Sequence, residues 1–334
     1  MIIDVDQLRA LSEAVLKRAG VPEPHAELQT DLLLEAELRG RPSHGLLRLA
    51  RIVERIGNKV ADPITTGKHS WRGDAFLEVD GQNGLGPVVA CSALDAIVEK
   101  AHTTGISIAA IANNNHLGMM AWYAERVASK GLTLLALSTS EALVHAWGGR
   151  RAMLGTNPIA IGVPASPRPF VLDMATSLVS MGQIHDYAHR NKPIPANWAL
   201  DAQGNPTTDA MAARDGSIAP FGAAKGYALG LAFEVLVASL TASAIGRDVR
   251  GTLDSTAVCN KGDVFIAVDA AVSGSMAATI GAYLQAIRED APANGFEFVA
   301  IPGDRSLAVR EERLRNGIPV ADGVWNDLLA LSKR

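Results

Sequence analysis

Two histidines and an arginine are the residues of this sequence best suited to proton transfer beside an anion. Ser43 and His44 are followed by Arg48, so on a helix the imidazole and the guanidinium would share one face. Histidine titrates near neutral pH and can exchange a proton with a carbonyl or hydroxyl oxygen, and arginine can hold a carboxylate by two hydrogen bonds. The same spacing is also typical of a helix start at which Ser43 is only the N-cap, and this alternative stays open.

His116 is the second candidate acid or base, because it lies in a polar turn after an apolar, strand-like run at 106–112. Ligands in open α/β sheets bind where strands end and the chain turns. Small and polar residues gather at three later places, which are residues 147–151, 154–158 and 172–177. We interpret residues 111–177 as the wall of a cofactor and substrate cleft, although a single histidine in a turn is more often structural.

The sequence lacks both common nucleotide-binding loops, G-x-G-x-x-G and G-x-x-x-x-G-K-[ST]. Two helix starts could hold phosphates instead. One follows residues 173–176, and the other follows residues 222–226, where exposed backbone amides would lie beside Lys225. Both starts could equally be capped or tightly packed helix termini.

A metal site has weaker support in the sequence. His185 and His189 have the i, i+4 spacing that zinc proteases use, but the glutamate beside the first histidine and an obvious third ligand are missing. We therefore predict no bound metal. The absence of a G-x-S-x-G motif removes support for a serine hydrolase.

The composition is that of an ordinary globular protein. The chain has 334 residues, of which 48% are hydrophobic and 20% charged, and the net charge is -4. Without clustered Lys and Arg, binding to nucleic acid is not expected. The two cysteines, Cys91 and Cys259, cannot form a disulfide framework, so a reducing cytoplasm is the expected location.

No membrane segment is predicted. The N-terminus has neither a basic region nor a long apolar segment, as a signal peptide would. The longest apolar stretch, at 227–246, contains Glu234, which a membrane helix would bury at a cost of several kcal/mol. We predict a buried core helix there.

The pattern of apolar residues predicts a helical first part followed by alternating strands and helices. Strands that alternate with helices imply a mixed or parallel sheet with covered faces. The predicted strands are 76–79, 106–112, 132–138, 170–172, 264–268 and 296–300. The predicted helices are 5–19, 23–39, one after Gly45, 87–102, 119–130, one from about 178 to 189, one from 225, 276–288 and 323–333. Residues 192–209 are predicted to form an ordered loop over the cleft.

Six motifs resemble those of the malate/L-lactate dehydrogenase-like oxidoreductases, over nearly the full length of the chain. This family includes sulfolactate, ureidoglycolate and diketogulonate dehydrogenases and cyclic-imine reductases. The motifs are Ser43-His44-Gly45 with Arg48, NNNHLG at 113–118, GG…LGTNP at 148–158, LDMATS at 172–177, IP…W…D..G.PTTD at 194–209 and PFG..KGY at 220–227. The segment 259–267 is most similar to the archaeal malate/sulfolactate branch.

The resemblance implies an α/β fold with a large mixed β-sheet and flanking helices, which binds NAD or NADP without a Rossmann fold, as in L-sulfolactate dehydrogenase. An N-terminal helical region at 1–70 is expected to pack with a C-terminal helix at 306–334. Residues 71–305 would form the cofactor-binding and catalytic core. The resemblance also implies a homodimer with the cleft near the subunit interface.

The resemblance implies hydride transfer between nicotinamide and C2 of a small 2-oxo or 2-hydroxy acid. By position, His44 would be the proton donor, oriented by Ser43, and His116 would line the same pocket and act as the acid/base in some branches. Arg48 and Thr156 would hold the substrate. The expected cofactor contacts are His116, Leu117, Gly118, Met119, Met120, Met174, Ala175, Thr176, Ala224, Lys225, Gly303 and Arg305.

Two positions depart from the family's pattern. Many members carry a tyrosine where this chain has Ile52, so the substrate pocket is expected to be less polar or differently shaped. Imine reductases carry an aspartate at the position of Gln183, so a cyclic imine is less favoured. We expect a malate-like or sulfolactate-like dianion, whose second anionic group would meet Arg150 or Arg151.

Three alternatives stay open. Within the family, the chain could reduce a cyclic imine such as piperideine-2-carboxylate or pyrroline-2-carboxylate. Outside it, the candidates are a metal-dependent hydrolase centred on His185 and His189 and a nucleotide-binding protein without catalytic activity.

Overall fold

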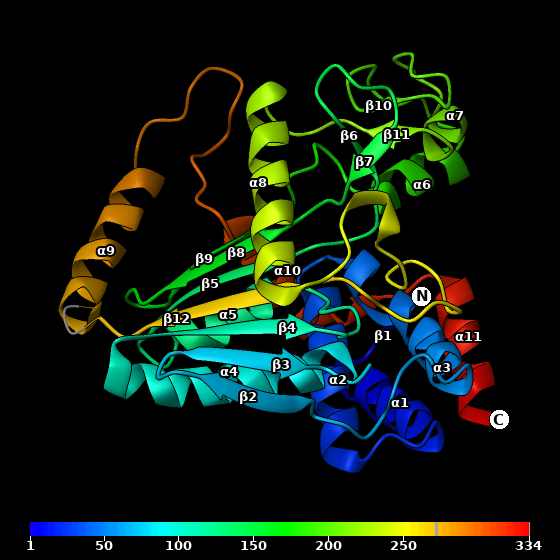
Figure 1. The fold of residues 1–334 in the computed structure, drawn as a ribbon. Helices are drawn as coiled ribbons and strands as arrows, with labels where there is room; N and C mark the ends of the chain where they lie inside the picture. Colours follow the sequence, from blue (N-terminus) through cyan, green and yellow to red (C-terminus); the bar gives the residue numbers. More distant parts are fainter. Residues whose placement is uncertain (271–272, 334) are drawn as a thin grey trace.

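A seven-stranded mixed sheet forms the centre of the protein, whose computed structural model describes residues 1–270 and 273–333 (Figure 1). The strand order is β2-β3-β4-β12-β5-β8-β9, and among the described residues of this sheet only β3 and β4 pair in parallel. The strands are β2 (Lys68–Arg72), β3 (Phe76–Asp80), β4 (Ile106–Ala112), β5 (Thr133–Ser138), β8 (Ile159–Val163), β9 (Phe170–Met174) and β12 (Asp263–Val268). The predicted mixed sheet with flanking helices is confirmed.

Helices cover both faces of the central strands. Alternate side chains of a strand point to opposite faces. Phe265 of β12 accordingly joins the core beneath α4 (Gly86–Thr104) and α5 (Ala121–Ala128), while the preceding Val264 packs with Val237 of α8 (Ala224–Thr241) on the other face. The apolar β4, β5 and β12 are thereby buried on both sides, which explains their nearly continuous apolar sequences.

The two ends of the chain pack together. Helices α1 (Val5–Arg18), α2 (Glu23–Leu38) and α3 (Leu49–Gly57) share a hydrophobic core with α11 (Asp322–Lys333), and β1 (Ile2–Ile3) pairs with β13 (Ile318–Pro319). α10 (Asp304–Asn316) packs on α2, where Arg310 donates to Glu35 at 2.7 Å. Both termini therefore lie on the same side of the molecule (Figure 1).

A smaller four-stranded sheet lies beyond one end of the main sheet (Figure 1). It has a hydrophobic core of its own, which includes Ile184, Ile194 and Ile218. Its strands are β6 (Val144–His145), β7 (Ala152–Leu154), β10 (Ala199–Leu200) and β11 (Ser217–Ile218), and its helices are α6 (Met181–His189) and α7 (Ala210–Arg214). The predicted loop at 192–209 connects α6 to α7 and contributes β10 to this sheet.

Three sequence-based expectations about elements are wrong. Residues 296–300 form no strand, and Phe296 and Phe298 are exposed. The expected single helix at 306–334 is two helices, α10 and α11, separated by β13, and residue 334 lies outside the described part. The helix expected directly after Gly45 begins only at Leu49, behind the 3₁₀ turns η1 (Pro42–His44) and η2 (Leu46–Arg48).

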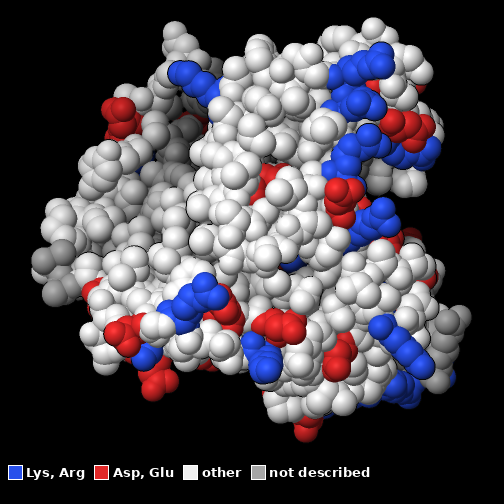
Figure 2. Space-filling view, in the orientation of Figure 1, with Lys and Arg blue, Asp and Glu red and all other residues white. Residues whose placement is uncertain are grey.

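Helix α8 is not the buried core helix that the sequence predicted. Glu234 is fully buried, but Leu229, Leu231, Val235 and Leu236 are exposed. The surface over α8 is largely uncharged (Figure 2). By length and composition α8 could also span a membrane, although apolar helices of soluble proteins pass the same test. A helix with apolar residues on all sides is expected to be buried, but the sequence does not show which part of the protein, or which partner, covers each face.

Candidate active site

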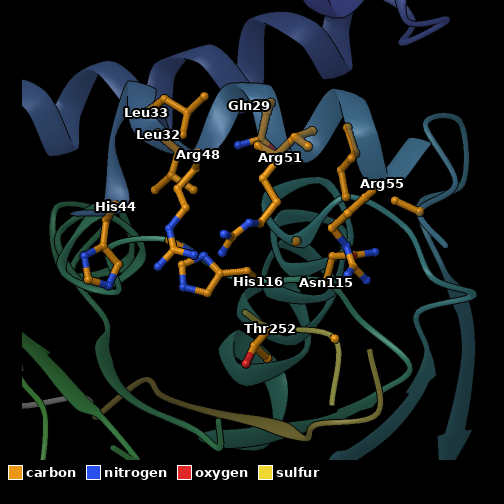
Figure 3. A pocket seen from close by; sticks show the side chains of 16 residues that line it. Gln29, Leu32, Leu33, His44, Arg48, Arg51, Arg55, Asn115, His116 and Thr252 are labelled. Atoms are coloured by element: carbon orange, nitrogen blue, oxygen red, sulfur yellow. The ribbon is translucent and has the colours of Figure 1, made fainter. Parts of the chain in front are cut away.

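A pocket opens where the segment after α2 faces the turn that follows β4 (Figure 3). α2, η1 and the first turns of α3 form one wall, and the opposite side comes from residues 115–118 and 251–252. The lining residues are Gln29, Leu32, Leu33, His44, Arg48, Arg51, Ile52, Arg55, Ala61, Leu85, Gly86, Asn115, His116, Gly118, Gly251 and Thr252.

The structure brings His44 and His116 together in this pocket. Their ring centroids lie 5.6 Å apart and the rings are stacked, with an angle of 29° between their planes. Ser43 Oγ lies 3.0 Å from His44 Nδ1, and the Gly118 N–H donates to His116 Nδ1 at 3.1 Å. Because His116 Nδ1 is an acceptor, its neutral ring carries the proton on Nε2. Each imidazole is held through Nδ1, and within the described residues the other nitrogen has no hydrogen bond.

Two close approaches fix the positions of these histidines. A Cβ on Gly86, the first residue of α4, would lie 2.0 Å from His116 O, so only glycine lets α4 begin against this turn. A Cβ on Gly45 would lie 2.3 Å from Glu37 Oε1, which accepts the Leu46 N–H at 2.9 Å. The S-H-G motif therefore ends in glycine because its backbone packs against α2.

Both imidazoles are neutral at pH 7. Burial, followed by the positive charges of Arg48 and Arg41, lowers the pKa of His44 to about 4. Burial, again followed by the charge of Arg48, lowers the pKa of His116 well below its usual value. A neutral imidazole is ready to accept a proton, and an anion bound to the arginines would favour its protonated form.

These shifts predict that His44 makes the fold less stable in acid. Between the unfolded pKa of about 6.5 and the folded value of about 4, the unfolded chain binds the proton and the folded chain does not. The free energy of unfolding should therefore decrease as the pH is lowered through this window. The decrease should reach about 3 kcal/mol when His44 is fully protonated. Urea unfolding of wild type and His44→Asn at pH 7 and pH 5 should show a flatter dependence in the variant. If the unfolding free energy of His44→Asn changes as much between pH 7 and pH 5 as that of wild type, this prediction is contradicted. It is also contradicted if replacing the exposed His189 reduces the change by the same amount.

Three arginines of one helical face enter the pocket (Figure 3). Arg48 Nε donates to Ser43 O at 2.7 Å, and its two terminal nitrogens have no hydrogen bond to any residue that the structure describes. Burial and the charge of Arg51 lower the pKa of Arg48 to about 10, as expected for a cation without a counter-ion. Of the three, only Arg48 was predicted from the sequence to bind the substrate, although Arg51 and Arg55 follow it by three and seven residues and so share its helix face.

A buried cluster that was not predicted from the sequence lies next to the turn that carries His116. Lys261 Nζ contacts both carboxylate oxygens of Asp263 at 2.5 Å, and the two side chains are 2% and 0% exposed. The same carboxylate accepts from Ser138 Oγ at 2.6 Å and from Asn114 Nδ2 at 3.2 Å. Ser138 ends β5, Asp263 begins β12, and Asn114 follows β4, so the cluster holds these three strand ends together. Asn114 is two residues before His116, which places the cluster close to that histidine in sequence.

Thr156 lies in a second group of predicted site residues. Thr176 N donates to Thr156 O at 2.8 Å, and Phe221 N donates to Thr176 O at 3.1 Å. Three predicted segments, which carry the motifs LGTNP, LDMATS and PFG..KGY, thus meet at one place. This group is linked to the pocket through Ser140 Oγ, 3.3 Å from Thr156 Oγ1, and through the neighbouring Glu141, which accepts the Thr252 N–H at 2.7 Å.

The turns at 116–121 and 172–176 also lie side by side, because Asp173 Oδ2 accepts the Ala121 N–H at 2.7 Å. Within the first turn the side chains of Leu117, Met119 and Met120 are buried in the hydrophobic core. Only the backbone of these three predicted cofactor contacts is therefore available to a ligand. Met174 and Ala175 are partly buried.

Of the two helix starts considered for phosphate binding, the structure leaves one open. α6 is capped, since Ser180 Oγ accepts the Gln183 N–H at 3.2 Å. α8 begins after Ala223, which makes no side-chain cap, and Ala224 and Lys225 are exposed there. Free amides and an ammonium group suit a pyrophosphate. Gly303, with φ +96°, precedes α10 next to Val171 O, and Arg305 is exposed.

Other candidate residues lie outside the pocket. Arg150 and Arg151 line a different, open and polar cavity together with Arg247, Asp201 and Asp215, among others. The structure therefore does not bring them to the histidines of the same chain. Among residues 1–270 and 273–333, His185 and His189 gain no third ligand, since no group of three His, Cys, Asp or Glu could hold a metal ion.

Glu234 positions the loop that carries Thr156. Its buried carboxylate accepts from Gly155 N at 3.2 Å, from Asn157 Nδ2 at 2.5 Å and from Gly246 N at 2.6 Å. In Glu234→Gln the amide nitrogen would face one of these donors, so we expect the unfolding free energy to fall by about 1–3 kcal/mol. We also expect a higher KM for substrate, because Thr156 moves with its neighbours. Chemical denaturation and steady-state kinetics test this, with the exposed Glu99→Gln as control. A loss no larger than that of the control would contradict it.

The fold is a mixed α/β sheet, and its main pocket holds a histidine pair beside Arg48 and Arg51. A family model described as malate/L-lactate dehydrogenase matches residues 3–329. The malate/(S)-sulfolactate dehydrogenase of Methanothermus fervidus is 34% identical, with 95% of this chain and 93% of that relative covered. A Delta(1)-pyrroline-2-carboxylate/Delta(1)-piperideine-2-carboxylate reductase of Pseudomonas aeruginosa is 32% identical, with 98% of each covered.

Solved structures give the same result. A dehydrogenase from Sinorhizobium meliloti has a TM-score of 0.95 and 49% identity, with 99% of this chain and 98% of that chain covered. The sulfolactate dehydrogenase from Methanocaldococcus jannaschii has a TM-score of 0.93 and 32% identity, with 100% and 97% covered. The chain belongs to the malate/L-lactate dehydrogenase family. It is an oxidoreductase acting on CH–OH, and its family implies a nicotinamide cofactor.

Proposed function

We propose that the protein transfers hydride between NAD(P) and C2 of a small 2-hydroxy or 2-oxo acid that carries a second anionic group, as malate and sulfolactate do. The observation that supports this best is the pocket itself. Two neutral imidazoles, those of His44 and His116, lie 5.6 Å apart beside Arg48 and Arg51, and no Asp or Glu is among the described residues that line the pocket. The arginines of such a pocket attract the carboxylate of a hydroxy acid, and a neutral imidazole can accept the proton of the hydroxyl group.

Arg48 holds the substrate carboxylate with the two terminal nitrogens that its bond to Ser43 leaves free. His44, oriented by Ser43 Oγ, accepts the C2 hydroxyl proton in oxidation and returns it to the carbonyl oxygen in reduction. The nicotinamide supplies the hydride acceptor or donor when it is bound. The bound carboxylate offsets the charges that lower the pKa of His44, so protonation of His44 becomes easier when the 2-oxo acid is present.

The cofactor would lie between the pocket and the second group of residues. The open start of α8 with Lys225 would hold its phosphates, and the backbone at 116–120, together with Met174, Ala175 and Thr176, would line its path. Gly303 and Arg305 would contact it at the start of α10. Preference for NAD or NADP is part of the test below.

Reduction of a cyclic imine is the second candidate function, because a relative that covers 98% of this chain is named for that reaction. Gln183, where imine reductases place an aspartate, lies next to Gly182, whose Cβ would be 3.4 Å from Ser43 Cβ. An amide at this place cannot accept a proton from Ser43 and His44 as a carboxylate would. This difference favours the 2-oxo acid.

A substrate panel tests the proposal. Purified protein is given NADH or NADPH with oxaloacetate, sulfopyruvate or piperideine-2-carboxylate, and loss of the reduced nicotinamide is followed by absorbance. We expect one of the two dianionic 2-oxo acids to have the highest kcat/KM. Turnover of the imine alone would replace the proposal by the second candidate. Cofactor binding, seen as nicotinamide fluorescence, without turnover of any of them would favour a non-catalytic nucleotide-binding protein.

We also propose that the protein works as a homodimer in the cytoplasm. The exposed leucines of α8, Leu229, Leu231 and Leu236, form the apolar surface that a second copy would cover. Cys91 and Cys259 are both free and buried, as is usual in a reducing compartment. Sedimentation velocity should give twice the chain mass, and Leu236→Glu should shift the protein toward the monomer.

A further inference from the structure

We infer that Arg51 is the residue that selects substrates with a second anionic group. The inference rests on the proposed function and assigns the two ends of the substrate to two different arginines. Arg48 would hold the carboxylate next to the reacting carbon, and Arg51, one helical turn further along α3, would hold the distal carboxylate or sulfonate. In Figure 3 the Arg51 side chain points into the pocket between Arg48 and Arg55.

The hydrogen bonds of the three arginines separate their roles. All three guanidinium nitrogens of Arg55 are engaged, with Asn115 Oδ1 at 2.9 Å, Asp254 O at 2.7 Å and Val60 O at 3.3 Å. Arg55 is therefore a structural brace between α3 and the loop beyond Thr252. Arg48 uses only Nε, and in the described part of the chain Arg51 has no hydrogen bond or ion pair at all. Arg51 is the cation whose whole guanidinium group is left for a ligand.

The charge around Arg51 is also uncompensated. Among the described residues that line the pocket there are three arginines and two histidines and no carboxylate. Arg48 and Arg51 repel each other, as the effect of Arg51 on the pKa of Arg48 shows. Holding such like charges together costs free energy, and a dianion recovers more of this energy than a monoanion does. A substrate with one carboxylate would leave Arg51 unpaired.

The apolar side chain of Ile52, next to Arg51 in sequence, increases the effect of the Arg51 charge on substrate choice. Ile52 lines the same pocket and packs partly against the core shared by α1, α2 and α11. It has no group that could bond a neutral polar substituent on the substrate. The distal end of the substrate therefore meets one strong donor, Arg51, beside an apolar surface, which favours an anion over a neutral group of the same shape.

Two 2-oxo acids of nearly equal shape test the inference. Oxaloacetate has a distal carboxylate, and 2-oxosuccinamate has a neutral amide at that place. We expect wild type to prefer oxaloacetate, and Arg51→Gln to lower kcat/KM for oxaloacetate about 30- to 100-fold, since a charge-assisted pair contributes roughly 2–3 kcal/mol. For 2-oxosuccinamate the same variant should stay within about threefold of wild type. Arg51→Lys should restore part of the preference, because it keeps the charge without the two-pronged geometry.

Arg151→Gln is the matched control, because it removes the same charge from an arginine outside this pocket. It should leave the ratio of the two kcat/KM values unchanged. No variant should unfold at a lower temperature than wild type, since Arg51 makes no bond in the described chain and its charge is repelled by Arg48. The inference is overturned if Arg51→Gln lowers kcat/KM equally for both substrates, or if Arg151→Gln instead removes the preference for oxaloacetate. Neither result would contradict the proposed dehydrogenase function. If wild type reduces neither acid but does reduce a cyclic imine, the proposed function itself fails.

Discussion

His44→Gln should lower kcat by about three orders of magnitude in both directions and leave the affinity for the reduced cofactor within a few fold. The glutamine amide fills similar space but cannot take up the proton of the C2 hydroxyl or return it, and general acid–base catalysis contributes roughly 10²–10⁴-fold. The ring of His44 lies 3.0 Å from Ser43 Oγ and stacks on His116, so the group that is lost is in the middle of the pocket. Steady-state kinetics and a fluorescence titration with NADH measure the two effects separately.

His116→Gln shows which histidine carries the proton. Because the Gly118 N–H donates to His116 Nδ1, the neutral ring carries its proton on Nε2 and has no free nitrogen that could accept the hydroxyl proton. We therefore expect His116 to donate a hydrogen bond to the substrate rather than to exchange the proton. Its replacement should therefore raise KM more than it lowers kcat. If His44→Gln retains near-normal kcat and His116→Gln does not, the two roles are exchanged. The exposed His189→Gln should change neither constant.

Arg48→Gln should raise the KM for the 2-oxo acid by about two orders of magnitude, because the carboxylate then loses a charged, two-pronged partner. The same change should act on His44. The charge of Arg48 is the second cause, after burial, of the lowered pKa of His44. Without it the imidazole holds its proton to higher pH, so the acidic limb of the pH profile for hydroxy-acid oxidation should move upward. A purely structural role for Arg48 would not predict this shift.

Two further variants isolate the effect on the proton. Arg48→Lys keeps the positive charge, so it should raise KM but leave the pH profile close to that of wild type. Arg126→Gln removes a charge that lies over the Trp122 ring, away from the pocket, and should change neither. An unchanged KM in Arg48→Gln, or a pH profile that moves equally in Arg48→Lys, would contradict the assignment.

Much of the fold was predictable because its strands and helices are regular and apolar. β4 has the bounds predicted from the sequence, Ile106–Ala112, and α4, α5, β5 and β12 differ from prediction by a few residues at their ends. The failures have local causes. Gly45 packs against Glu37 and breaks the expected helix, and the aromatic residues Phe296 and Phe298, which suggested a strand, are exposed and lie outside any strand of the described chain. No local pattern reports such contacts.

The candidate site was predictable only in part. His44, Ser43 and Arg48 came from spacing and resemblance, and the structure brings them together with His116. The Lys261–Asp263 cluster and the brace made by Arg55 were not found, because each depends on partners from distant strands or loops. The hypothesis for Arg150 and Arg151 rested on two adjacent charges, a feature that says nothing about direction in space.

A crystal structure of the protein with the unreactive pair of oxidised cofactor and oxaloacetate tests the central claim most directly. The account predicts oxaloacetate in the pocket between α3 and the turn at 115–118, with its carbonyl oxygen within hydrogen-bond distance of His44, and the nicotinamide ring against C2. Oxaloacetate or nicotinamide bound elsewhere, with the pocket of His44, His116 and Arg48 holding neither, would contradict it.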